Sequence, residues 1–203
     1  GNKYKWHKKK ALKIIENTAK RYPKAYGTHN CKNLKGSILK RSLSLKINQV
    51  SPVEKPILGM VNYKNVNKIY YKIFRTNWKE KRKLRLWGKN LVQHFLEQKK
   101  KIKSGEFSLP SDGDYQNHSV EIKLPYLDSG MYFVVVSATS GFNMSKNVAA
   151  YTYFNVSDIA YIQRNGTNKG LEFQVMHRST GKPLEGVEVK SWYEKWDRDK
   201  RRY

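Results

Sequence analysis

The feature that most constrains the fold of this chain is the alternation of apolar and polar residues between Ser42 and Val156. Leu43, Leu45 and Ile47 alternate with polar neighbours, as in a strand that has one buried face. Similar alternation, or a β-branched run, recurs in residues 57–63, 68–75, 120–124, 128–138 and 147–156. Strands and helices do not follow one another in a regular βαβ rhythm, so a parallel sheet is not expected. The pattern predicts an antiparallel sandwich of about six or seven strands.

Two further segments have helical spacing instead. Residues 5–22 place apolar side chains on one face and lysines on the other, and Pro23 ends this pattern. Because a single amphipathic helix is marginal in water, we expect it to pack on the following chain or on neighbours upstream of Gly1. Residues 77–103 predict a helix inserted between strands, which covers an edge or a face of the sheet. Its apolar stripe is Leu84, Trp87, Leu91 and Phe95.

After Val156 a second set of strands begins. Residues 159–164, a segment around Phe173 and the end of the hairpin "STGKPLEGVEV" are each expected to be strands. In this hairpin Gly181 suits a turn position that requires a positive φ angle. The side chains expected to be buried there are Leu184, Val187 and Val189.

These patterns divide the chain into three parts. Residues 1–40 form a helical segment, residues 41–156 a β-sandwich with a helical insertion at 77–103, and residues 157–203 the opening strands of a second β domain. Three strands cannot enclose a sandwich core, which needs about seven strands and about 100 residues. The predicted fold class is therefore mainly β: an immunoglobulin-like antiparallel sandwich with an N-terminal and an inserted helix, followed by a partial, truncated second β domain of a larger protein.

The formal net charge of +25 is concentrated in two segments. Residues 1–40 hold twelve Lys and Arg against one Glu, and residues 77–104 hold ten against two acidic residues. Such segments are usually solvated faces, and they can also bind an anionic partner. We expect Trp78 and Trp87 on the apolar face of the inserted helix, although indoles among cations could also stack on bases. The candidate polyanion contacts are Lys79, Lys81, Arg82, Lys83, Arg85, Lys99, Lys100, Lys101 and Lys103.

Residues typical of catalytic and metal sites are sparse. Cys31 is the only cysteine, so no internal disulfide and no Cys-x-x-Cys zinc pair can form. The five histidines share no short metal-type spacing, and His29 near Cys31 is not by itself a catalytic dyad. Asp112 and Asp114 resemble part of a calcium loop, but Lys123 stands where the twelfth-position carboxylate is needed, which favours a polar turn. We expect no enzyme, and no catalytic, cofactor or metal site.

Three tyrosines have predicted roles in a sandwich. Tyr132 follows the turn Asp128-Ser-Gly130, and its hydroxyl could bond to a nearby backbone carbonyl, as in the tyrosine corner of immunoglobulin-type folds. Tyr151 and Tyr153 are the spaced aromatic pair that a carbohydrate-binding sandwich would need on an exposed strand face. Of these roles the structural one for Tyr132 is favoured.

Four segments carry a likeness to a known family. They are "RYPKAYGTHNC" (Arg21–Cys31), "VNYKNVNKIYYKIFR" (Val61–Arg75), "LPYLDSGMYFVVVSA" (Leu124–Ala138) and "STGKPLEGVEV" (Ser179–Val189). Together they resemble the amino-terminal region of bacterial alpha-2-macroglobulin-like proteins of the Bacteroidetes type. The resemblance implies macroglobulin domains, such as MG2, which are immunoglobulin-like sandwiches strung in series. It assigns residues 41–156 to one such domain and residues 157–203 to the next.

The same resemblance implies a function for the parent protein. Members of this family are envelope lipoproteins, periplasmic or extracellular and associated with the outer membrane, that act as endopeptidase inhibitors by trapping proteases. Their Cys-x-Glu-Gln thioester motif is not matched here, where the cysteine stands in Cys31-Lys32-Asn33-Leu34. We therefore expect a non-enzymatic structural and interaction fragment.

The expected partners of such a fragment are the other domains of the parent chain, proteases through the full-length protein, and an anionic envelope surface. The alternative, which rests on the charge, is a basic module that binds nucleic acid or another polyanion. The fold favours the first interpretation, and nucleic acid is not the expected partner.

Overall fold

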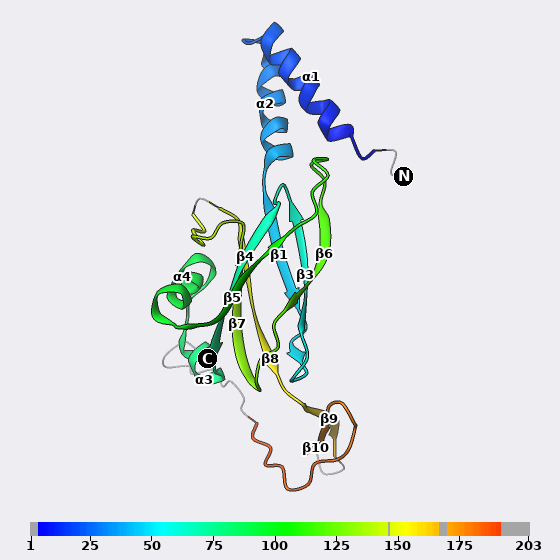
Figure 1. Cartoon of the computed structure of the whole chain (residues 1–203), viewed down its shortest axis with the longest axis vertical. Helices are drawn as coiled ribbons and strands as arrows, with labels where there is room; N and C mark the ends of the chain where they lie inside the picture. The colour runs from blue at the N-terminus through cyan, green and yellow to red at the C-terminus, as the bar shows by residue number, and fades with distance from the viewer. Residues whose placement is uncertain (1–3, 146, 167–169, 192–203) are drawn as a thin grey trace. The chain divides into compact units, whose positions relative to one another are not determined.

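The computed structural model describes residues 4–145, 147–166 and 170–191. The chain falls into two compact units, unit 1 (Gly1–Val156) and unit 2 (Ser157–Tyr203). Unit 1 contains two N-terminal helices, a β-sandwich and two short helices between strands (Figure 1). No helix in the described part of the chain is long and apolar enough to cross a membrane.

Two sheets face each other in unit 1. The first has the order β1-β3-β6 and consists of β1 (Ser42–Ile47), β3 (Ile57–Lys64) and β6 (His118–Leu124). The second has the order β2-β8-β7-β4-β5 and consists of β2 (Val50–Ser51), β8 (Ala149–Val156), β7 (Gly130–Ser137), β4 (Lys68–Thr76) and β5 (Lys101–Ser108). Within the described residues the pairs are antiparallel except for the short parallel contact of β2 with β8. The predicted antiparallel sandwich is confirmed.

The main core lies between these two sheets. In β3 every second residue from Ile57 to Tyr63 is buried, whereas the alternate residues Leu58, Met60 and Asn62 face solvent. From the opposite sheet Ile73 and Val134, which are register partners, are fully buried in the same core. Because burial follows a period of two, a slip of one residue would turn the apolar side chains of β3 to water. The alternation in the sequence therefore determines which face of β3 is buried and excludes a slip of one residue.

A second core lies on the outer face of the five-stranded sheet. There α4 (Gly88–Gln98) packs with Leu91, Val92 and Phe95 on the sheet (Figure 1). The rings of Phe95 and Phe133 stack with centroids 4.0 Å apart. Strand β7 is consequently buried on both faces, which explains its uninterrupted apolar run. The prediction that an inserted helix covers a face of the sheet is confirmed.

The predicted helical insertion over residues 77–103 consists of two helices and ends before residue 103. The segment contains α3 (Trp78–Lys83), an extended link over residues 84–87, and α4, after which β5 begins at Lys101. Asn77 caps α3 by accepting a hydrogen bond from the Glu80 amide at 2.9 Å. Gly88 has a positive φ of 55°, which breaks the helical path before α4. The side chains of strand β5 show no alternation of buried and exposed positions. This strand forms because its backbone pairs with β4.

The predicted N-terminal helix is confirmed as α1 (His7–Arg21), but the sequence pattern delimits no second helix within the predicted helical segment 1–40. The helical pattern is expected to end at Pro23, but the following residues form α2 (Tyr26–Leu39), and Gly27 lies in the first turn of this helix. The two helices pack together, with Ile15 and Ile38 buried (Figure 1). This contact supplies the apolar partner that a lone amphipathic helix needs.

The C-terminal end of α2 is tied to the sandwich by Asn65, in the turn between β3 and β4. The Nδ2 group of Asn65 donates to the carbonyl oxygens of Ile38 and Lys40, at 2.8 and 3.2 Å. The Nζ of Lys64 donates to the Ser37 carbonyl at 2.8 Å. Since the last carbonyls of a helix have no intrahelical partner, these bonds satisfy them and attach the helix to the turn.

Unit 2 is a hairpin of β9 (Ile159–Asn165) and β10 (Leu171–His177). Gly181 has the expected positive φ, 70°. The predicted third strand is wrong, because only a single bridge from Met176 to Pro183 extends the sheet and residues 187–190 have no strand structure. The side chains expected to be buried are at least partly exposed, at 36, 40 and 46% for Leu184, Val187 and Val189. The physical reason is that no second sheet faces β9 and β10 among the described residues of unit 2.

The predicted tyrosine corner is present, and it provides a test of the fold. The Tyr132 hydroxyl donates to the Asp128 carbonyl at 2.7 Å, and its side chain is buried. Removing this hydroxyl in Tyr132→Phe should lower the free energy of unfolding by about 1 kcal/mol, the usual net value of such a bond. The matched control is Tyr126→Phe, whose side chain is 66% exposed. Urea unfolding should separate the two variants, and equal stability of both would contradict a role for the corner.

Candidate functional sites

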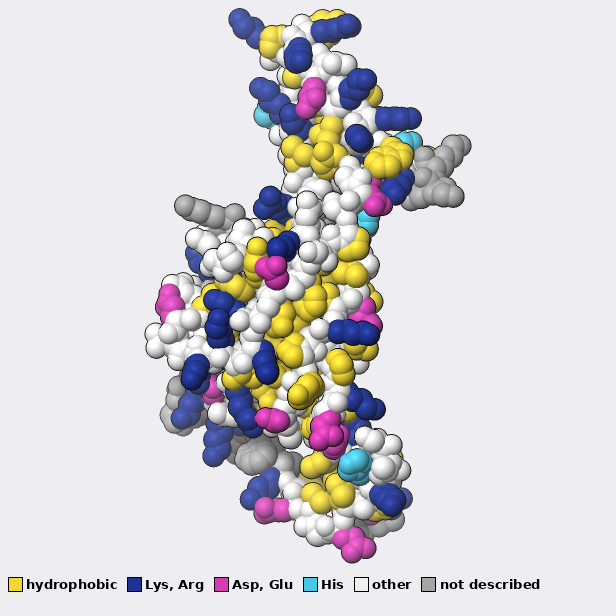
Figure 2. Space-filling model, in the orientation of Figure 1, with side chains coloured by type: hydrophobic (Ala, Val, Ile, Leu, Met, Phe, Trp, Pro, Cys, Tyr) yellow, Lys and Arg dark blue, Asp and Glu magenta, His cyan; other side chains and the backbone are white. Residues whose placement is uncertain are grey.

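The predicted polyanion contacts come from neighbouring elements on one side of unit 1. Lys79, Lys81, Arg82 and Lys83 lie on α3, Arg85 lies in the link before α4, Lys99 and Lys100 lie between α4 and β5, and Lys101 and Lys103 lie on β5. The Lys99 Nζ and Glu80 Oε1 atoms, 2.5 Å apart, bring the start of β5 to α3. Figure 2 shows dark-blue Lys and Arg side chains on this side of the unit.

Two of these cations have partners within the protein. Lys99 pairs with Glu80, and the Lys81 Nζ lies 4.8 Å from the Trp78 ring centroid and 4.9 Å from that of Tyr153. The remaining seven are exposed: Lys79, Arg82, Lys83, Arg85, Lys100, Lys101 and Lys103. The predicted set is therefore brought together, but only these seven cations are exposed to solvent.

Glu80 is the acidic centre of this region. Burial opposes its ionisation, but hydrogen bonds from Lys99 and from the Thr76 hydroxyl (2.8 Å), with the charges of Lys99 and His94, outweigh burial. The pKa of Glu80 is therefore held below its ordinary value. An ionised Glu80 fixes Lys99 and joins α3, β4 and the start of β5.

The prediction that the tryptophans face the core is wrong. Trp78 is 55% exposed and Trp87 is 82% exposed. Trp87 precedes α4 in extended conformation and so falls outside the helical stripe. The Gly88 amide donates to the Tyr151 hydroxyl at 3.0 Å, which fixes this turn against the sheet. Helical spacing could not reveal this, because the helix starts one residue later.

The carbohydrate interpretation of Tyr151 and Tyr153 is also wrong. Both rings lie beneath α4 and contact its core: Tyr151 is 5.5 Å from Phe133, and Tyr153 is 6.1 Å from Phe95. Burial, together with the charge of Glu80 and the neighbouring Tyr151, raises the pKa of Tyr153 to about 12. The pair supports the helix and does not form an open stacking platform.

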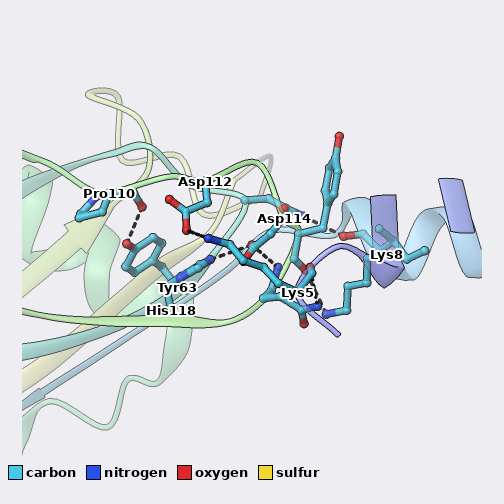
Figure 3. A network of polar contacts seen from close by, with 11 residues as sticks. Lys5, Lys8, Tyr63, Pro110, Asp112, Asp114 and His118 are labelled. Carbon is cyan, nitrogen blue, oxygen red and sulfur yellow. Dashed lines mark hydrogen bonds and ion pairs between the residues drawn. The ribbon is translucent and has the colours of Figure 1, made fainter. Parts of the chain in front are cut away.

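A polar junction connects α1 to the loop between β5 and β6 (Figure 3). Lys5 pairs with Asp112 at 2.6 Å, and the Lys8 Nζ donates to the Tyr115 carbonyl at 3.0 Å. Asp114, whose side chain is buried, accepts from the Gln116 amide and from the His118 ring, each at 2.8 Å. No sequence pattern indicated the two lysine contacts, since they join residues 107 positions apart.

Asp114 stabilises an unusual backbone conformation in this junction. Tyr115 has a φ of 60°, a region that non-glycine residues rarely occupy. The Asp114 carboxylate accepts a hydrogen bond from the Gln116 amide, which lies on the other side of Tyr115, as in an Asx turn. Burial raises the pKa of Asp114, but the bonds from Gln116 and His118 and the charges of His118 and Lys5 lower it more, so the net pKa is below its ordinary value.

The predicted interpretation of Asp112 and Asp114 as a polar turn matches these contacts, because each carboxylate already has protein partners. Across the described residues, no group of three His, Cys, Asp or Glu side chains is placed to hold a metal ion. Cys31 is half-buried in α2. What the arrangement offers chemically is a packed β scaffold with a cationic surface.

The comparisons with known proteins concern the fold. No protein-family model and no curated protein sequence matches the chain. The structure is similar to native alpha-2-macroglobulin from Escherichia coli spanning domains MG0-NIE-MG1, with a TM-score of 0.50 and 19% identity. That alignment covers 72% of this chain and 48% of the other, so the chain spans about half of that structure. The alpha-2-macroglobulin-like macroglobulin fold implied by the sequence resemblance is confirmed at the level of fold.

Two more distant structures are also similar. Escherichia coli alpha-2-macroglobulin activated by porcine elastase aligns with a TM-score of 0.37 and 9% identity, covering 68% of this chain and 15% of the other. A CARDB domain from Pyrococcus furiosus, solved in complex with di-metal ions, aligns with a TM-score of 0.32 and 14% identity, covering 58% of this chain and 88% of the other. At these TM-scores neither adds to the argument.

Glu80 should contribute to stability only while it is ionised. Because its folded pKa is below the unfolded one, this contribution is present above the ordinary carboxylate pKa and is lost as the pH falls through the folded value. Glu80→Gln should lower the free energy of unfolding by about 1 kcal/mol at pH 7, after allowing for solvent screening. The difference from the wild type should shrink below about pH 4. Urea unfolding at pH 7 and below about pH 4 measures this difference in the free energy of unfolding. The control is Glu121→Gln, which changes an exposed acid of β6.

Asp114→Asn tests the junction. The amide oxygen can still accept from Gln116, but the charge facing His118 and Lys5 is lost. Amide hydrogen exchange in α1 should become roughly fivefold faster at neutral pH, which corresponds to about 1 kcal/mol, while exchange in β7 stays unchanged. Asp128→Asn, an exposed acid before β7, is the matched control. Unchanged exchange in α1 would show that the junction does not hold the helix.

Proposed function

We propose that this chain is a non-enzymatic structural and interaction fragment of an alpha-2-macroglobulin-like protein of the Bacteroidetes type. The observation that supports it most is the macroglobulin-like sandwich of unit 1, together with the four resembling segments. The interior of this sandwich is filled by apolar side chains. A domain built in this way transmits position and force between its neighbours and needs no reactive group, so it acts as a rigid spacer.

Unit 2 supports the proposal that a further macroglobulin domain begins at Ser157. One face of its hairpin is an apolar groove of about 500 Å³, lined by both strands and by residues 187–191. Tyr161 and Leu171 in this groove are 64 and 51% exposed. Apolar strand faces of this kind are normally covered by a second sheet. Further strands of the parent protein would cover this face, which makes the other domains of the parent chain the first expected partners.

The parent protein, in this proposal, is an endopeptidase inhibitor that traps proteases. It would be a periplasmic or extracellular lipoprotein associated with the outer membrane. Protease binding is then a property of the full-length protein, since the described residues of this chain offer a spacer and no reactive thioester. The alternative, a basic module for nucleic acid, has the seven exposed cations in its favour, and a titration with labelled DNA at two salt concentrations tests it.

The proposal predicts a difference between this chain and its full reading frame. The chain alone, in molar excess, should leave the rate of casein digestion by chymotrypsin unchanged. The protein from the full reading frame should slow the digestion at an equimolar ratio. Stoichiometric inhibition by the 203-residue chain would show that it is an inhibitor in its own right. Failure of the longer protein to inhibit a panel of endopeptidases would contradict the trapping role.

Amide hydrogen exchange in the same two proteins tests the proposed role of unit 2. Amides of β9 and β10 should exchange faster in this chain than in the longer protein, because the longer protein covers the sheet face. Amides of β7 serve as the internal control, since both faces of β7 are already buried in unit 1. Equal exchange of β9 and β10 in both proteins would argue against a second domain that starts at Ser157.

A further inference from the structure

We propose that the surface around Trp78 and Trp87 docks peripherally on a lipid bilayer that carries anionic headgroups. The tryptophan patch consists of these two residues and the exposed cations of α3, the link to α4, the first turn of α4 and the start of β5. Its cations are Lys79, Arg82, Lys83, Arg85, Lys89, Lys100 and Lys101. The inference concerns a surface of unit 1 and does not depend on the function of the parent protein.

The sheet beneath α4 brings the two tryptophans to one neighbourhood. Tyr151 and Tyr153 are two residues apart on β8 and therefore point to the same face. The Tyr151 hydroxyl holds the amide of Gly88, next to Trp87. The Lys81 Nζ lies between the rings of Tyr153 and Trp78. Both tryptophans are therefore held by their backbone or neighbours, while Trp87 is 82% and Trp78 is 55% exposed.

The charge around these rings has one sign. Glu80 is the only acidic residue between Trp78 and Lys89, and its carboxylate is already paired with Lys99. Among the described residues, none of the patch cations forms an ion pair with an acidic side chain. A juxtaposed anionic bilayer attracts each such Lys or Arg by about 1 kcal/mol. Charge complementarity thus selects an anionic partner.

The apolar part of the patch favours a bilayer over nucleic acid. Indole rings prefer the interface between headgroups and acyl chains, because one edge is apolar and the N–H can remain hydrated. Ile102, next to Lys101, is 42% exposed, and Leu86, next to Trp87, is half-exposed. Aliphatic side chains add contact with acyl chains but contribute nothing to base stacking. Long lysine side chains can lie along the membrane surface while their ammonium groups reach the phosphates.

The test measures binding of the 203-residue chain to vesicles by sedimentation. Vesicles of phosphatidylcholine alone are compared with vesicles that also contain phosphatidylglycerol. We expect binding only to the anionic vesicles, and it should weaken as salt is added. Trp87→Ala should reduce the partition coefficient at least about fivefold, from the apolar area it withdraws. The pair Arg82→Glu with Lys83→Glu should reduce it roughly 25-fold or more.

Matched variants separate this surface from general basicity. Lys10→Glu with Lys13→Glu makes the same charge change on exposed positions of α1, and Tyr126→Ala removes an exposed aromatic ring outside the patch. Each control should reduce the partition coefficient by less than about a third of the reduction caused by its matched patch variant. Because Trp87 is mostly exposed, its variant should unfold at the same urea concentration as the wild type, which excludes misfolding.

Each remaining outcome overturns the proposal. Equal losses in patch and control variants would show attraction by net charge alone. Absence of binding to anionic vesicles would show that the tryptophan patch does not dock on a bilayer. A labelled single-stranded oligonucleotide is the third arm: if it binds more tightly than the anionic vesicles and loses affinity in Trp87→Ala, the patch is a nucleic-acid site instead.

Discussion

The structure of unit 1 depends on burial of the central strands of the five-stranded sheet on both faces. Inside, β7 contributes Val134 and Val136 to the core between the sheets, and outside it contributes Phe133, on which Phe95 of α4 stacks at 4.0 Å. Without α4 the outer face would expose a row of aromatic rings, at a cost of about 25 cal/mol for each Å². The short helix inserted between β4 and β5 is therefore part of the core. Both clusters of this core consist of apolar side chains.

The helices at the start of the chain are joined to this sandwich in a different manner. Among the described residues, the polar contacts that attach them lie in two loops, one at Asn65 and one at Asp112 and Tyr115. Individual bonds of this kind contribute about 1 kcal/mol each, much less than the apolar core. The helical pair and the sandwich therefore differ in the kind of force that holds them, and the loops between strands carry the connection.

The surface charge has a structural role beside any role in binding. Strand β5 lies at the edge of its sheet, where unpaired backbone groups would invite another strand to pair. Lys101 and Lys103 on this edge oppose such pairing, and Lys68 of the adjacent strand pairs with Glu106 at 2.7 Å. Edge protection accounts for the lysines of β5. It does not account for the exposure of Trp78, in α3, and Trp87, before α4, which carries an energetic cost in water.

What the sequence by itself determined is the sandwich and which face of each strand is turned to its core. Period-two alternation in β1, β3 and β6 and the two-sided burial of β7 are written in the order of apolar residues, because each strand must bury one or both faces. The tyrosine corner, the glycine turns and the N-terminal helix α1 also followed from local rules that act within a few residues. The partner helix α2 did not, since its sequence has little apolar periodicity and its stability comes from packing on α1.

Only the tertiary structure decided the contacts between distant residues. Strand β5 exists because β4 offers it a hydrogen-bonding edge, and its own side chains give no strand pattern. The candidate cations were recognised from composition, but which of them are paired, as Lys99 is with Glu80, depends on how β5 returns to α3. The exposure of Trp87 depends on a turn one residue before α4, and the junction of Lys5 with Asp112 joins segments far apart in sequence. Local periodicity reports which face is apolar, whereas pairing across the fold depends on the path of the whole chain.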